Sequence, residues 1–180
     1  MNRTEMVAVV ERIAGLLSLL TLGLIAYLIV ALLRRQVPAI VRQDLALPLA
    51  TLIAFGATAG SLFFSEVAGY TPCVLCWYQR IAMYPLVIVC GVAVLRRNAN
   101  VLTTVLPITA IGASISIWHI MVEQRPALGG MCDSQAPCAL KWINEFGFLT
   151  LPTMALIAFV AISLLVIAAR QPNTVSTNSL

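Results

Sequence analysis

Apolar residues form five long blocks along this chain, and short polar segments separate the blocks. Together the blocks contain one arginine, one histidine and no acidic residue, and each has about the 20 residues needed to cross the apolar core of a bilayer. The apolar runs are continuous and lack the alternation of a half-buried strand. The pattern therefore predicts an all-α integral membrane protein with transmembrane helices at residues 13–33, 45–64, 77–95, 101–121 and 148–169.

The polar segments divide the chain into three expected parts. Residues 1–44 are expected to form a first transmembrane helix and a cytoplasmic linker, residues 45–170 a bundle of four helices, and residues 171–180 a polar tail. The first apolar block is longer than that of a cleavable signal peptide, and Arg34-Arg35 follows it. We therefore expect this helix to be retained.

Composition strengthens the membrane assignment. Hydrophobic residues make up 61% of the 180 residues and charged residues only 10%, whereas about a quarter of the residues in a soluble domain are charged. The net charge of +4 comes largely from arginines at the ends of the apolar blocks, where long basic side chains reach the membrane surface. No basic stripe with interleaved aromatic residues is present, so nucleic acid is not an expected partner.

The distribution of arginines predicts the orientation of the bundle. The connections after the first and third blocks are short, and such arginine-rich loops stay in the cytoplasm. The N-terminus and two pairs of cysteines would then face the oxidising extracytoplasmic side, where disulfides persist. The arginines in the two connections are Arg34, Arg35, Arg42, Arg96 and Arg97.

The first cysteine pair, Cys73 and Cys76, lies where a polar connection enters the third apolar block. If the helix begins at about Trp77, Cys76 lies at its N-terminus, where free N–H groups and the helix dipole favour a thiolate. Arg80, one turn later, favours the same charged form. A redox-active dithiol is the leading interpretation because the thiolate is the attacking form of cysteine.

Two other interpretations of this pair remain open at this stage. The cysteines could be inert apolar packing residues, or they could form half of a zinc site. A zinc site needs two further ligands, and the single histidine, His119, lies at the far end of another predicted helix. We therefore expect no bound metal.

The second pair, Cys132 and Cys138, flanks five residues in the longest polar connection. The pair could form a structural staple, or an exposed disulfide that a soluble dithiol attacks. Two pairs on one membrane face favour a relay that passes electrons from one pair to the other. Cys90 is about 21 Å beyond Cys76 along a helix, so we expect it to be a packing residue.

A relay needs a final electron acceptor, and the sequence favours a lipid-soluble quinone. The chain has no Gly-x-Gly-x-x-Gly motif, and a single histidine argues against paired haem ligation. A quinone can reach the outer end of a helix bundle from within the bilayer. Arg80 could stabilise negative charge on a quinone oxygen, and His119 could donate a hydrogen bond or a proton to one.

The chain closely resembles the disulfide bond formation protein B (DsbB) family over about residues 46–170. His119 precedes Cys132, as in that family, and Trp142 follows Cys138. Three further motifs carry the resemblance: Pro72-Cys73-Val74-Leu75-Cys76-Trp77-Tyr78-Gln79-Arg80, Met83-Tyr84-Pro85 and Phe146-Gly147-Phe148-Leu149-Thr150-Leu151-Pro152.

The resemblance implies a membrane thiol:quinone oxidoreductase in the bacterial plasma (inner) membrane. Ubiquinone or menaquinone would be its cofactor, and a DsbA-like thioredoxin-fold thiol oxidase its partner. Cys73 and Cys76 would be the quinone-proximal pair, with Cys76 meeting the quinone beside Arg80 and His119. Cys132 and Cys138 would face the partner, with Cys132 forming the mixed disulfide.

Two features depart from the best-known enterobacterial pattern. The five-residue spacing between Cys132 and Cys138 is shorter and more similar to the BdbC-type members of Gram-positive bacteria. The helix before Leu45 is additional to the four-helix core of the family. Two rival functions also remain open, namely a vitamin K epoxide reductase-like enzyme and a non-catalytic membrane scaffold with structural disulfides.

Overall fold

The computed structural model describes residues 2–97, 99–130, 132 and 136–170, and it confirms the all-α membrane architecture. Five of the described helices are long and apolar enough to cross a membrane. Within the described residues, the only β pairing is an isolated bridge between Glu145 and Leu149. The predicted tail at 171–180 lies outside the described residues. The spans are α1 (Arg3–Leu33), α2 (Ala46–Leu62, extended by a π-helix at Phe63–Val67), α3 (Val74–Leu95), α4 (Leu102–Gln124) and α5 (Leu151–Arg170).

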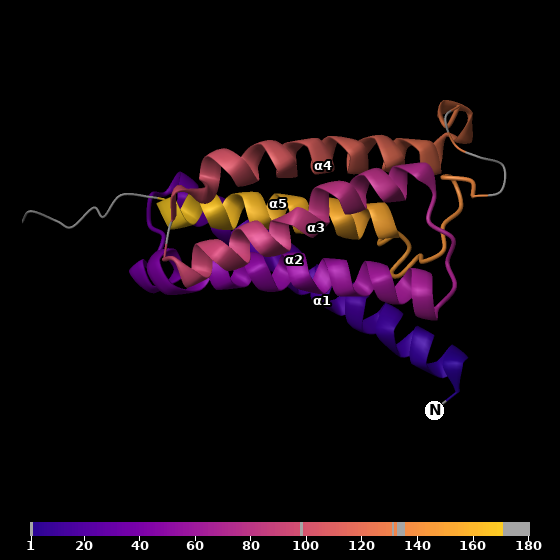
Figure 1. Ribbon diagram of the computed structural model, residues 1–180, viewed down its shortest axis with the longest axis horizontal. Helices are drawn as coiled ribbons and strands as arrows, with labels where there is room; N and C mark the ends of the chain where they lie inside the picture. The colour runs from indigo at the N-terminus through magenta and orange to yellow at the C-terminus, as the bar shows by residue number, and fades with distance from the viewer. Residues whose placement is uncertain (1, 98, 131, 133–135, 171–180) are drawn as a thin grey trace, which may run out of the picture.

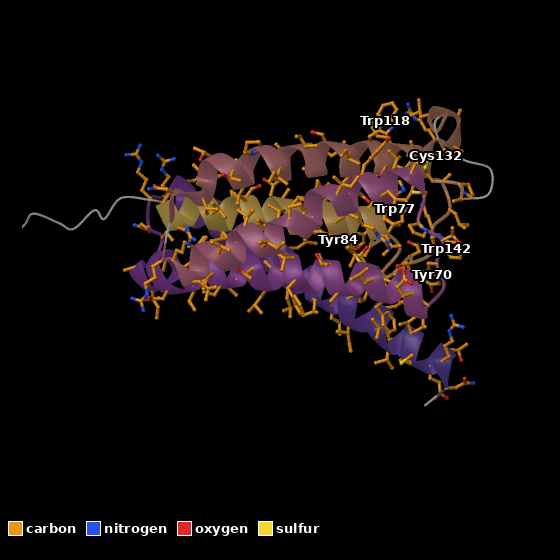
Figure 2. The ribbon with its side chains drawn as sticks, in the orientation of Figure 1. Tyr70, Trp77, Tyr84, Trp118, Cys132 and Trp142 are labelled. Carbon is orange, nitrogen blue, oxygen red and sulfur yellow. A yellow bond between two sulfur atoms is a disulfide. The ribbon has the colours of Figure 1, made fainter. Side chains whose placement is uncertain are left out.

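The helices run along the long axis of the molecule, and α5 packs against α1, α2 and α4 (Figure 1). α1 diverges from the other helices toward the N-terminus, which lies at the same end as the connection that follows α4. Tyr70, Trp77, Trp118 and Trp142 gather toward this end (Figure 2). Tryptophan and tyrosine concentrate where a membrane protein meets the lipid headgroups. This end therefore lies at one face of the membrane.

Two helices begin earlier than the apolar pattern predicts, and side-chain caps explain both. Asn2 and Glu5 form a capping box that starts α1 at Arg3, so the predicted start at residue 13 is wrong. Cys73 is the N-cap of α3, which begins at Val74 and not at Trp77. The first turn of α1 is polar and therefore invisible to a search for apolar blocks, although the Asn-x-x-Glu pattern is a recognisable helix start.

Two buried clusters divide the bundle along its length. The larger one fills the half distant from the cysteine pairs and includes Leu28, Leu86 and Phe159. Cys90 belongs to it and has no exposed surface, which confirms its assignment as a packing residue. The smaller cluster contains both pairs, with Cys73, Leu75, Val122 and Cys138 at its centre.

A glycine permits the close approach of α4 and α5. A Cβ atom added at Gly112 would lie 2.3 Å from Cζ of Phe159, whose ring is completely buried. We expect Gly112→Ala to destabilise the protein by about 1–3 kcal/mol through overpacking. Thermal unfolding in detergent would measure the loss. Gly23→Ala on α1 is the control, because its added Cβ meets nothing within 4 Å, and a midpoint in Gly112→Ala as high as in this control would contradict the prediction.

Candidate active site

The first cysteine pair is a close, reduced dithiol at the start of α3. The two sulfurs lie 2.9 Å apart and share a hydrogen bond. The Cys76 amide N–H also donates to Cys73 Sγ, at 3.3 Å. The sulfur that accepts from the helix N-terminus is therefore that of Cys73, not that of Cys76 as the sequence suggested. This difference from the prediction arises because α3 begins at Val74, which makes Cys73 its N-cap residue.

The surroundings of Cys73 favour its thiolate. The hydrogen bond from the Cys76 thiol lowers the pKa of Cys73; burial opposes this shift, and the nearby His119 ring assists it. Only 4% of Cys73 is exposed to solvent. The dithiol therefore loses its first proton readily and the negative charge then resides on Cys73, while Cys76 keeps its proton and donates it in the hydrogen bond.

This assignment predicts a thiolate that persists in mild acid. In the reduced protein, the ultraviolet absorbance of the Cys73 thiolate should remain at about pH 6, well below the ordinary cysteine pKa of about 8.5. The lowered pKa of Cys73 stabilises the folded state. This stabilisation is complete above the pKa that Cys73 has in the unfolded chain, and it is lost as the pH falls through the pKa in the folded protein. Cys73→Ser should abolish the signal and His119→Gln should move its titration to higher pH. A wild-type signal that titrates near the ordinary value would contradict the assignment.

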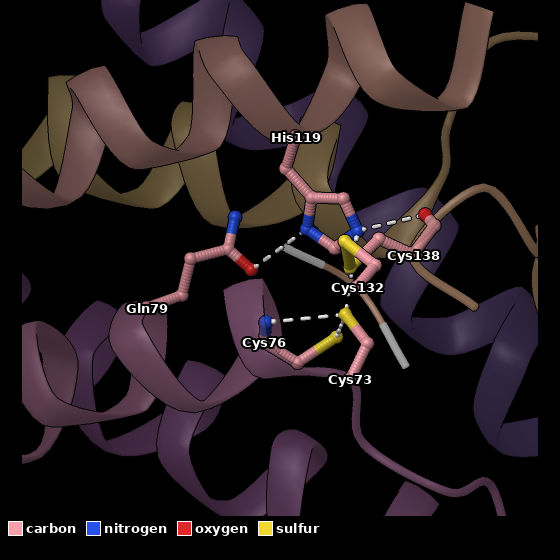
Figure 3. Close-up of a disulfide and its surroundings, with 6 residues drawn as sticks. All are labelled: Cys73, Cys76, Gln79, His119, Cys132 and Cys138. Atoms are coloured by element: carbon pink, nitrogen blue, oxygen red, sulfur yellow. Dashed lines mark hydrogen bonds between the residues drawn. A yellow bond between two sulfur atoms is a disulfide. The ribbon is translucent and has the colours of Figure 1, made fainter. Parts of the chain in front are cut away.

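His119 joins the first pair to the second through its Nε2 atom (Figure 3). Nε2 lies 3.1 Å from the carbonyl oxygen of Cys138 and 3.6 Å from Cys73 Sγ. Nδ1 lies 3.5 Å from Gln79 Oε1. Ser116 holds this amide in place, because its Oγ accepts from Gln79 Nε2 at 2.9 Å and donates to a backbone carbonyl of α4. Each ring nitrogen thus faces an acceptor, and the buried imidazole can hold a proton at either position.

The second pair, Cys132 and Cys138, forms a disulfide in the connection between α4 and α5. Cys138 is buried, and together with Cys73, Cys76 and His119 it lines a crevice of about 10 Å³. Such a space holds about one water molecule. The disulfide and the dithiol therefore pack against each other with almost no solvent between them. The residues between the two cysteines lie partly outside the described part of the chain.

Three potential metal ligands converge at this point. The ligand atoms of Cys73, Cys76 and His119 lie within 4.8 Å of one another. The sequence argument that His119 is remote from the pair is therefore wrong, because α4 returns antiparallel to α3 and brings its end to the start of α3. A structural zinc site takes four such ligands, and this group supplies three.

A large, mostly apolar cavity lies beside the dithiol, between α1, α2, α3 and α5. Its volume is about 380 Å³, within the range of sites for drug-sized ligands. Polar groups converge on one part of its wall, where Cys76, Gln79 and Arg80 of α3 meet Ser61 of α2. Apolar side chains of all four helices line much of the remainder.

Arg80 is held on the cavity wall by neutral partners. Its Nε donates to Ser61 Oγ and its second guanidinium nitrogen to the Ser61 carbonyl, both at 2.9 Å. The guanidinium carbon also lies 5.2 Å from the centre of the Trp77 ring. These partners orient the guanidinium without cancelling its charge, and only 9% of Arg80 is exposed.

Tyr84, one turn beyond Arg80, contributes a buried hydroxyl with no hydrogen-bond partner among the described residues. An unsatisfied buried hydroxyl costs free energy, so its place on a cavity wall suits a ligand that carries an acceptor oxygen. A quinone fits this donor set: a flat ring with two carbonyl oxygens would meet Arg80 and Tyr84, and an apolar tail would occupy the rest of the cavity.

The family model described as "Disulfide bond formation protein DsbB" matches residues 43–169. The chain belongs to the DsbB family. Disulfide bond formation protein C of Bacillus subtilis (strain 168) is 48% identical over 113 residues, which cover 62% of this chain and 82% of that relative. Probable disulfide formation protein C 1 of Bacillus anthracis is 44% identical over 124 residues, covering 68% and 89%. No solved structure gives a significant match to this chain.

Membership of the DsbB family makes this chain a multi-pass membrane thiol oxidoreductase of disulfide bond formation. The match to proteins named disulfide bond formation protein C agrees with the resemblance to BdbC-type members. The matched region begins at residue 43, so α1 lies outside the family model.

The structure brings five of the six candidate residues into one cluster: the four cysteines and His119. It separates His119 from Arg80, although both were expected to contact the quinone. Cys76 and Arg80 line the large cavity, whereas His119 lines only the crevice between the cysteine pairs. Two residues that orient His119, Gln79 and Ser116, were not predicted from the sequence. Their spacing was the available signal, since Gln79 lies three residues after Cys76 and Ser116 three residues before His119, on the same helix faces.

Proposed function

We propose that this DsbB-family protein is a protein-dithiol:quinone oxidoreductase that reoxidises an extracytoplasmic DsbA-like thiol oxidase. Electrons pass from the partner to Cys132–Cys138, then to Cys73–Cys76, and finally to ubiquinone or menaquinone. The observation that best supports this order is the position of Cys76. Its side chain lines both the crevice beside Cys138 and the large cavity beside Arg80, so it is the sulfur that both ends of the route can reach.

The first step is exchange with the partner. A thiolate of the reduced partner attacks the Cys132–Cys138 disulfide and forms a mixed disulfide with Cys132. The second partner thiol displaces Cys132, so the partner leaves as a disulfide and the protein gains two electrons and two protons as the Cys132/Cys138 dithiol.

The second step moves the reducing equivalents between the two pairs. The Cys138 thiolate attacks Cys73 of a Cys73–Cys76 disulfide and releases Cys76; Cys132 then attacks Cys138 and releases Cys73. A sulfur whose thiolate is stabilised leaves readily, and Cys73 has that stabilisation from Cys76 and His119. His119 takes and returns the proton at Nε2. The products are the Cys132–Cys138 disulfide and the Cys73/Cys76 dithiol, which is the pattern of bonds in the structure.

The third step occurs at the large cavity. A bound quinone would supply a two-electron, two-proton acceptor for the reoxidation of the Cys73/Cys76 dithiol. Cys76 presents its sulfur to the cavity, and Arg80 and Tyr84 are the donors that would hold the quinone oxygens and favour negative charge on them. The apolar wall keeps bulk water away from the sulfur.

The proposed function also implies which end of the bundle faces the cytoplasm. Arg34, Arg35, Arg96 and Arg97 follow α1 and α3 at the end of the bundle opposite the cysteine pairs (Figure 1). This concentration of arginine supports a cytoplasmic location for that end, in the bacterial plasma (inner) membrane. The cysteine pairs then face the extracytoplasmic space, where the partner is oxidised.

The test is an assay with purified protein, a reduced thioredoxin-fold dithiol protein and a soluble quinone. Loss of quinone absorbance should require the dithiol protein and should match the number of disulfides formed in it, one for one. A protein that leaves the quinone unchanged, or that reduces a quinone epoxide instead, would refute the proposal. Extraction of the purified protein would show which quinone it carries.

A further inference from the structure

α1 lies outside the matched family region, yet it forms one wall of the large cavity. Four of its residues line the cavity: Ala14, Leu17, Ser18 and Thr21. Their spacing of three, four and seven residues places them on one face of the helix. The four-helix core therefore leaves a side of this cavity that only α1 covers.

Specific contacts at the outer end hold α1 in this position. Arg3 Nε donates to the Val67 carbonyl at 2.9 Å, and the Tyr70 hydroxyl donates to the Glu11 carboxylate. Burial, followed by the hydrogen bond and the negative charge of Glu11, raises the pKa of Tyr70 to about 12, so this hydroxyl remains a donor at neutral pH. Tyr70 in turn stacks on Trp142, with ring centres 4.9 Å apart.

A close backbone approach adds to these contacts. Gly15 is buried, and a Cβ atom there would lie 3.3 Å from Cε2 of Phe146, in the turn before α5. α1 is thus attached to the end of α2, to the segment before α3 and to the turn before α5. Three separate attachments are more than a simple membrane anchor requires.

The cavity face of α1 extends inward from the outer end of the bundle. α1 and α2 run in opposite directions from the contact between Arg3 and Val67. Gly15, next to Ala14, approaches Phe146 in the turn before α5, so the α1 face starts near the outer end of the bundle. Thr21 lies about 10 Å further along the helix, at 1.5 Å per residue.

The chemistry of this face suits a hydrocarbon chain. The hydroxyls of Ser18 and Thr21 both donate to carbonyls of their own helix, at 2.8 Å. They therefore present mainly carbon to the cavity, as do Ala14 and Leu17. A ring with polar oxygens is better placed near Arg80, and an apolar tail is better placed here.

We propose that α1 is part of the quinone site and that its Ala14, Leu17, Ser18 and Thr21 face binds the isoprenoid tail. This inference rests on the proposed quinone reduction and extends it, because it assigns a binding role to a helix outside the family core. α1 then contributes to the affinity for long-tailed quinones and leaves the chemistry of the ring unchanged.

Filling the cavity from α1 tests the inference. Ala14→Phe projects a ring into the tail section, and Ser18→Phe does so one turn further along. Ala26→Phe is the matched control, since Ala26 is exposed on the same helix and does not line the cavity. Two measurements apply to the full-length proteins: the quinone extracted per folded molecule, and KM for a long-tailed quinone beside KM for a ring analogue without a tail.

Ala14→Phe and Ser18→Phe should carry less quinone and show a KM for the long-tailed quinone raised about tenfold, as expected when about two methylene groups lose their apolar contacts. Their turnover of the tailless analogue should equal that of wild type and Ala26→Phe, which also shows that they are folded. Equal losses with both quinones, or no loss with either, would overturn the role of α1 in tail binding. Failure of wild type to carry or reduce any quinone would instead refute the proposed function, and this inference with it.

Discussion

Cys76→Ala should have no measurable quinone reductase activity with a reduced dithiol protein as the electron donor. Cys76 is the sulfur that lines both the large cavity and the crevice beside Cys138, and without it Cys73 has no partner with which to form a disulfide. Quinone absorbance followed over time in detergent measures the loss. The first exchange should still proceed once in this variant, so the Cys132/Cys138 dithiol is expected to accumulate, and alkylation of its thiols would detect it as a mass shift.

Cys90→Ala provides the control for a lost thiol. Cys90 is completely buried in the core cluster distant from the active site. Its substitution should reduce stability modestly and leave turnover near the wild-type value at permissive temperature. Turnover by Cys76→Ala, or equal losses in the two variants, would show that the assignment of the reactive sulfurs is wrong.

Arg80→Gln should raise KM for the quinone by about 10- to 150-fold. Hydrogen bonds to a charged group contribute about 1.5–3 kcal/mol, and each 1.4 kcal/mol corresponds to a factor of ten. The guanidinium is buried on the cavity wall, and its partners among the described residues are neutral, so its charge is available to a bound oxygen. Glutamine keeps a donor that can reach Ser61, and the thermal midpoint should therefore change little.

Arg96→Gln is the matched control for the loss of one positive charge. Arg96 is exposed at the end of α3 opposite the cysteine pairs. Its substitution should leave KM unchanged. The charge-stabilising role of Arg80 is refuted if Arg80→Gln has the same quinone affinity as wild type, or if it loses stability and activity together.

Much of the architecture could be predicted because a membrane imposes simple requirements on a sequence. A spanning helix must satisfy its own backbone and present about 20 apolar residues, so the five spans are visible as uninterrupted blocks. The helix starts were predicted less well. Asn2 and Cys73 begin α1 and α3 through side-chain caps, and these local hydrogen bonds involve polar residues outside the apolar blocks.

The same distinction applies to the candidate site, where contacts within one helix could be predicted and contacts between helices could not. The pairing of Cys73 with Cys76 and the position of Arg80 one turn later follow from helical spacing, and they could be predicted. The position of His119 could not be predicted, because the approach of the end of α4 to the start of α3 depends on how the two helices pack. The argument against a zinc site therefore treated His119 as remote from the cysteines, although its Nε2 lies 3.6 Å from Cys73 Sγ.

Residue types and local spacing were enough to predict the membrane class, the two cysteine pairs, the basic connections and the resemblance to the DsbB family. Each of these depends on features within a single segment. The packing of the helices was needed to show which sulfur the helix N-terminus stabilises, where His119 lies, and that α1 closes a cavity beside Cys76 and Arg80. The physical reason is that cavities and shared protons arise between helices, from contacts between residues far apart in the chain.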